Sequence, residues 1–136
     1  MPRNIHGNWA TKFENRILFS KVDGSTNHEQ SLAMFKDIQH QVLSAHPDGL
    51  EAWVALTDAR DWGLATEDSW ESTNRVIDWM REHQCVFLAV AFSKQLQTYA
   101  AEQGFVNEGG VIQYFYDYDE AYQACLNKLK QIKSHK

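Results

Sequence analysis

"LEAWVALTD", residues 50–58, is a mostly apolar run that ends on an acid. A second apolar run, "CVFLAVAF", occupies residues 85–92. Short apolar runs of this kind are typical of strands that are buried on both faces of a sheet. We therefore expect two central strands here, which the rest of the chain has to cover.

Before these runs, the sequence predicts a hairpin followed by a helix. The segments "WATKF" and "RILFSKV" (9–13 and 16–22) are rich in β-formers and are separated by Glu14-Asn15. Thr26 followed by Glu29 then matches a capping box. The residues after it repeat apolar side chains at helical spacing, namely Leu32, Phe35, Ile38 and Val42.

Strand and helix patterns alternate through the rest of the chain. A second helix is predicted to open near Thr66 and a third over residues 94–104, while "VIQYFYD" (111–117) predicts a fifth strand. A last helix follows, capped by Asp117 or Asp119. The order β-β-α-β-α-β-α-β-α predicts one α/β domain over residues 1–136, with a mainly parallel sheet and helices packed on it.

Composition limits the functions that this chain can have. With 136 residues and 43% hydrophobic content, the chain can bury a core without disulfides, so its two cysteines are expected to be buried thiols. The net charge of −5 argues against a nucleic-acid groove, because phosphate binding needs clustered bases. We see neither a membrane-spanning run nor a secretion signal, and expect a cytoplasmic location.

Two stretches resemble a known family. "WVALTDARDWG" (53–63) joins an apolar strand ending in Asp to an aromatic-containing loop, and "VIQYFYDYDEAYQACL" (111–126) joins an aromatic strand to an acidic cap and an Ala-rich helix. With the element order, they resemble the STAS domain of sulfate transporters and anti-sigma-factor antagonists, and more closely its bacterial SpoIIAA-like branch. The resemblance implies a regulatory or binding module, not an enzyme. It would act through a protein partner, a homodimer, or a small-molecule or lipid ligand near the loop after the third strand.

The same resemblance raises a phospho-regulated partner switch as an alternative. In anti-sigma-factor antagonists, a serine at the start of the second helix is phosphorylated, in an Asp-Ser-Gly context after the third strand. Here Asp58 is followed by Ala-Arg-Asp-Trp, which departs from that pattern. The candidate acceptors are therefore Thr66 and Ser69. Both also fit an unmodified helix start, with Thr66 as the cap and Ser69 in the first turn.

Polar side chains gather where the third and fourth predicted strands end. Asp58, Arg60 and Asp61 follow the third strand, and Lys94 follows the fourth. In open parallel sheets, ligands bind outside the carboxyl ends of the strands. These groups are candidate contacts for a small polar ligand, with Trp62 as an apolar wall. The alternative is a surface Asp–Arg pair with ordinary turn chemistry.

Motifs for metal binding and catalysis do not stand out. The six histidines lack the spacing of a zinc helix motif, and neither cysteine has a ligand partner nearby in the sequence. No serine lies in a Gly-x-Ser-x-Gly pattern. We therefore expect no metal site, no catalytic residue and no cofactor, and an enzyme of unknown reaction is the least favoured of the three readings.

Overall fold

The computed structural model describes residues 8–46, 51–106 and 110–134. Its elements follow one another as β1 (Asn8–Glu14), β2 (Ile17–Thr26), α1 (His28–Ser44), β3 (Trp53–Ala65), α2 (Ser69–Glu82), β4 (Cys85–Ala91), α3 (Gln95–Gly104), β5 (Ile112–Phe115) and α4 (Tyr118–Ser134). This is the predicted order, and it confirms the α/β class.

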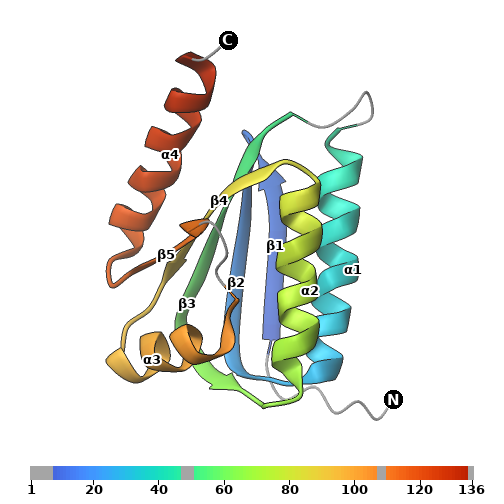
Figure 1. The fold of residues 1–136 in the computed structure, drawn as a ribbon, viewed down its shortest axis with the longest axis vertical. Coiled ribbons are helices and arrows are strands. Elements are labelled where there is room, and N and C mark those ends of the chain that lie inside the picture. The colour runs from blue at the N-terminus through green and yellow to red at the C-terminus, as the bar shows by residue number, and fades with distance from the viewer. Residues whose placement is uncertain (1–7, 47–50, 107–109, 135–136) are drawn as a thin grey trace.

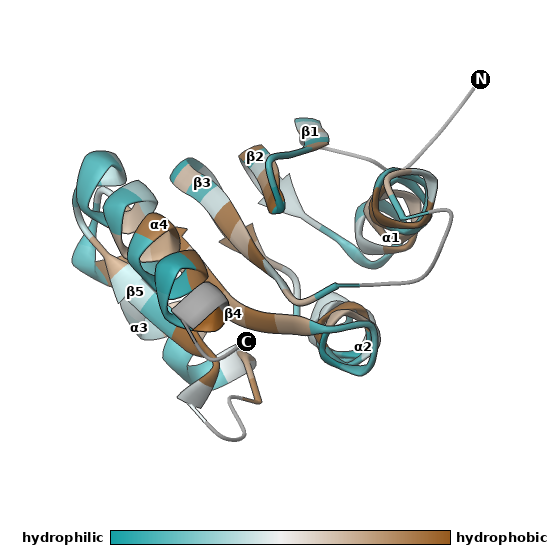
Figure 2. Cartoon of the chain, turned by 90° about the horizontal axis from the view of Figure 1, so that it is seen from above, coloured by the Kyte–Doolittle hydropathy of each residue, from teal (hydrophilic) through white to brown (hydrophobic). Residues whose placement is uncertain are grey.

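The five strands form one sheet in which spatial order equals sequence order. β1 is antiparallel to β2, and the other neighbours are parallel. Figure 1 shows α1 and α2 side by side along the sheet, and Figure 2, seen from above, shows α4 on the opposite face. The sheet is therefore the middle layer of three.

Alternation along the strands divides the core into two clusters. On β3, Ala55 belongs to the cluster beneath α1 and α2, whereas Val54 and Leu56 belong to the cluster beneath α4. All three are at least 99% buried. This two-sided burial explains why the central strands read as continuous apolar runs.

The hairpin turn and the N-cap of the first helix each lie one residue later than predicted. The turn is Asn15-Arg16, and both residues have positive φ, as a two-residue type I′ turn requires. The N-cap of α1 is Asn27, whose side chain accepts from the Gln30 N–H, so the capping box predicted at Thr26 is wrong.

The predicted inner face of α1 is also partly wrong. Leu32 is 44% exposed, while the residues of α1 that are buried are Gln30, Ser31, Ile38 and Val42. Two of these are polar, and a pattern search for apolar residues cannot detect buried polar positions.

β3 runs well past the predicted end at Asp58. It continues to Ala65 because β2 is long enough to pair with it as far as Thr26, with two register shifts on the way. β4 stops at the level of Asp58, and the Gln97 side chain of α3 takes its place by donating to the Trp62 carbonyl at 2.8 Å. The predicted loop is thus a bulged strand extension.

Candidate functional site

Asp58 and Arg60, two of the predicted ligand contacts, bind each other. Nε and Nη2 of Arg60 each lie 2.9 Å from a carboxylate oxygen of Asp58. The same guanidinium lies 5.0 Å from the centre of the Tyr118 ring. Hydrogen bonding to Arg60 holds the pKa of the Asp58 carboxyl below its usual value. The Asp58 carboxylate is therefore committed to a partner within the protein.

The other predicted contacts do not converge on that pair. Asp61 is exposed and pairs loosely with Lys21, whose Nζ lies 3.9 Å away. Trp62 is buried in the cluster beneath α1 and α2. Lys94 precedes α3, and in the part of the chain that the structure describes its ammonium forms no ion pair with Asp58 or Asp61. Ligand binding by these residues stays a prediction.

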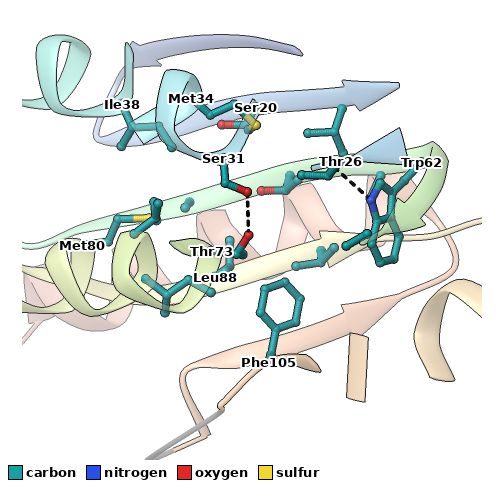
Figure 3. A pocket seen from close by; sticks show the side chains of 18 of the residues that line it. Ser20, Thr26, Ser31, Met34, Ile38, Trp62, Thr73, Met80, Leu88 and Phe105 are labelled. Atoms are coloured by element: carbon teal, nitrogen blue, oxygen red, sulfur yellow. Dashed lines mark hydrogen bonds between the residues drawn. The ribbon is translucent and has the colours of Figure 1, made fainter. Parts of the chain in front are cut away.

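An apolar pocket of about 130 Å³ lies between α1, α2 and the sheet, here called the helix–sheet pocket (Figure 3). On its floor, β3 contributes three small residues at alternate positions, Ala55, Thr57 and Ala59. The helices contribute longer side chains, including Met34 from α1 and Met80 from α2. Small residues under two helices leave volume that the long side chains do not fill.

Aromatic rings close one end of this pocket. Trp62 meets Trp70 edge-on at 6.1 Å and stacks on Phe92 at 5.9 Å, and Trp70 meets Phe105 at 5.1 Å. The Trp62 indole N–H donates to Thr26 Oγ1 at 3.2 Å, which fixes its orientation. The end of the pocket is therefore rigid and apolar.

The helices α1 and α2 meet above the pocket through hydroxyl groups. Ser31 Oγ and Thr73 Oγ1 lie 3.0 Å apart, and Figure 3 shows this bond over the pocket. Phe35 and Trp79 make an edge contact at 5.9 Å. The seam thus combines one hydroxyl pair with one aromatic pair, and the pocket lies beneath the hydroxyl pair.

The chemistry of the lining favours binding over reaction. Among the described residues, those that line the pocket include no Asp, Glu, Lys, Arg, His or Cys. Such a lining offers no general acid, base or thiolate. An apolar cavity of about 150 Å³ binds benzene in another protein, so this pocket suits a molecule of about that size.

The sequence predicts Trp62 as an apolar wall beside a polar ligand, but it does not predict the helix–sheet pocket that Trp62 lines. The available signal was the alternation of small residues at Ala55, Thr57 and Ala59 opposite the hydroxyls of Ser31 and Thr73. That alternation looks like an ordinary half-buried strand until the helices are placed on it.

The predicted phosphoacceptors differ in access. Thr66 is exposed and lies before α2, and its hydroxyl bonds to the Asp68 carboxylate. Ser69 is fully buried, and both its N–H and its hydroxyl donate to the Thr66 carbonyl. The N-cap of α2 is Asp68, so the prediction of Thr66 as the cap is wrong, whereas Ser69 lies in the first turn as predicted. Modification of either residue stays a prediction.

Both cysteines are free and buried, as predicted. Burial raises the pKa of the Cys85 thiol and of the Cys125 thiol to about 12. Within the described ranges, no three acidic, histidine or cysteine side chains are grouped to hold a metal ion. No helix in those ranges has the length and apolar content to cross a membrane.

No protein-family model matches this sequence, and no curated protein matches it. Solved structures do match. An uncharacterized protein of the DUF3478 family from Shewanella loihica PV-4, solved with a SpoIIAA-like fold, has a TM-score of 0.64 and 18% identity, covering 92% of this chain and 98% of its own. This chain has a SpoIIAA-like fold.

Two anti-sigma factor antagonists share this SpoIIAA-like fold. One, from Mycobacterium paratuberculosis, has a TM-score of 0.64 at 9% identity and covers 93% of this chain and 99% of its own. The other is SpoIIAA in its unphosphorylated form, with a TM-score of 0.56 at 10% identity and coverage of 86% and 96%. These likenesses confirm the predicted STAS-like architecture, and at such identities they concern the fold alone.

Proposed function

We propose that this chain is a non-catalytic binding module that holds a small apolar ligand in the helix–sheet pocket. The observation that carries the proposal is the volume of about 130 Å³ among apolar side chains. Protein interiors are close-packed, so apolar space of this size between the helices and the sheet is uncommon. A ligand that fills the pocket buries its apolar surface there, which favours binding.

The proposed ligand pocket includes part of the β3 extension that follows Asp58. Trp62 and Ala65, which line the pocket, both follow Asp58 in the extension of β3. The part of this extension that faces the pocket is apolar, whereas the Asp58–Arg60 pair is satisfied internally. We therefore place the ligand beside Trp62 and not beside the ion pair.

Binding of toluene tests this proposal by isothermal titration calorimetry and thermal unfolding. We expect one toluene per chain and a raised unfolding midpoint, since a ligand of the folded state stabilises it. Ala55→Leu fills the floor of the pocket and abolishes the effect, while Leu32→Ala, an exposed change on α1, leaves it intact. Absence of toluene binding, or equal binding by the folded Ala55→Leu variant, contradicts the proposal.

A protein contact through α3 is the second part of the proposed function. Leu96 and Tyr99, one turn apart on α3, are 61% and 62% exposed. Isolated exposed apolar side chains are ordinary, but neighbouring large ones favour an interface. The fold relatives named as anti-sigma factor antagonists support a regulatory role of this kind.

A homodimer is the simplest such contact, and sedimentation velocity measures it. The wild type is expected to dimerise with rising concentration and Leu96→Glu to remain monomeric. A wild type that stays monomeric at all concentrations would contradict the proposed homodimer.

The phospho-regulated partner switch is the alternative function, and Thr66 is its better-placed acceptor because it is exposed while Ser69 is buried. A phosphate there would lie near the N-terminus of α2, which favours anions. Intact mass measured on the protein from cells is expected to show an added phosphate that Thr66→Ala removes. An unmodified mass under all growth conditions contradicts the switch.

A further inference from the structure

Two hydroxyl groups on the pocket floor have no hydrogen-bond partner in the described part of the chain. Ser20 of β2 and Thr57 of β3 are register partners on adjacent parallel strands, and both line the helix–sheet pocket. Ser20 is 8% exposed, and Figure 3 labels it among the residues that line the pocket. They form one polar spot on an otherwise apolar floor.

The other hydroxyl groups of the pocket differ in this respect. Ser31 and Thr73 bond to each other, and Thr26 accepts from the Trp62 indole N–H. Ser20 is 8% exposed and Thr57 is partly exposed, so both hydroxyls stay accessible from the pocket that they line. They are therefore placed to bond a polar atom of a ligand in the pocket.

We infer that the ligand is a compact, electrically neutral molecule that carries a single hydroxyl or carbonyl group, a phenol-like compound in size and polarity. Its polar atom meets Ser20 and Thr57, and its apolar body contacts Met34, Ile38 and Trp62. This inference rests on the proposed function, because it names the ligand class of the same pocket.

The side chains that line the pocket argue against a charged ligand. A carboxylate or ammonium moved into this pocket would lose its hydration without gaining a counter-charge, since no charged side chain lines it. A neutral group needs only the hydrogen bonds that Ser20 and Thr57 offer. Phenol, toluene and benzoate are therefore the informative probes, because they share a ring and differ in one substituent.

The test compares these probes on the wild type and on the double variant Ser20→Ala/Thr57→Val, by titration calorimetry. The measured quantity is the ratio of the dissociation constant of toluene to that of phenol. We expect this ratio to fall about fivefold in the double variant, since a hydrogen bond contributes about 1 kcal/mol. Benzoate is expected to bind neither protein.

The outcomes separate this inference from the proposed function. If neither toluene nor phenol binds the wild type, the proposed function fails. If both bind but the ratio is the same in wild type and variant, this inference alone fails. That result is the one expected if a bound water already satisfied both hydroxyls. Preferential binding of benzoate overturns it as well.

Folding of the variants is measured by urea unfolding. Removing two unpaired hydroxyls is expected to leave the ligand-free protein at least as stable as the wild type. If the double variant does not fold, the single variants Ser20→Ala and Thr57→Val carry the same comparison, with a smaller expected fall in the ratio.

Discussion

The two faces of the sheet are covered in different ways. One helix, α4, covers one face and rests on small residues of β4, with Cys125 Sγ 3.5 Å from the Ala55 carbonyl oxygen. Two helices cover the other face and meet through Ser31 and Thr73, leaving the helix–sheet pocket beneath their seam. Small strand residues lie on both faces, and the pocket lies on the face that is covered by a pair of helices.

Matched alanine-to-leucine changes on the two faces should have the largest and most different effects. Ala89→Leu, beneath α4, is expected to lower the free energy of unfolding by about 3 kcal/mol, because Ala89 is fully buried in the cluster that packs against α4. Ala55→Leu, on the pocket floor, should change it by less than about 1 kcal/mol. Urea unfolding measures both free energies. Equal decreases in the two variants would contradict the proposed difference in packing between the two faces.

Gly104→Ala tests the aromatic end of the pocket. A β-carbon at Gly104 would overlap the indole ring of Trp70, which must then shift. We expect a loss of about 2 kcal/mol in the free energy of unfolding, together with weaker toluene binding. The exposed neighbour Gln103→Ala serves as the control and should stay within about 0.5 kcal/mol of the wild type. A fully stable Gly104→Ala protein would contradict this packing.

Asp58→Asn tests the polar pair beside Tyr118. Loss of the charge-assisted bonds to Arg60 is expected to cost about 1.5 kcal/mol at pH 7. Because folding lowers the pKa of Asp58, its contribution is complete above the unfolded-state pKa of about 4 and is lost as the pH falls through the folded-state pKa. The difference between wild type and variant should therefore shrink below about pH 4. Asp61→Asn, an exposed control, should cost about 0.5 kcal/mol or less.

The smallest expected effect concerns the thiols, one in each core cluster. Cys85 lies in the cluster beneath α1 and α2, and Cys125 beneath α4. With pKa values raised to about 12, both should resist a thiol reagent at pH 8 until urea unfolds the protein. Cys85 should be labelled first, since its face is less tightly filled. Faster labelling of Cys125 would contradict the claim that the face beneath α1 and α2 is the less tightly packed one.

The sequence predicts the fold well because burial on both faces leaves continuous apolar runs at Trp53–Leu56 and Cys85–Ala91. It also predicts an Asp–Arg surface pair at Asp58 and Arg60, beside the possible ligand site, and the structure confirms that pair. The two register shifts that carry β3 to Ala65 depend on pairing with β2, which no local pattern reveals.

The pocket is equally hidden from sequence. Its volume results from small residues of β3 facing hydroxyls of α1 and α2 across the core, and contacts of this kind are set only when the helices are placed. For the same reason, Trp62 was predicted beside Asp61 and Lys94 but lies in the pocket, within the core cluster beneath α1 and α2.

Crystals pressurised with xenon test the central claim most directly, because xenon enters dry apolar cavities. The account predicts a xenon peak between Met34, Ile77 and the Trp62 ring in the wild type, and no peak in Ala55→Leu. A wild-type pocket without xenon, or one filled by a chain of ordered waters, would contradict the claim that this face of the sheet is built to hold an apolar ligand.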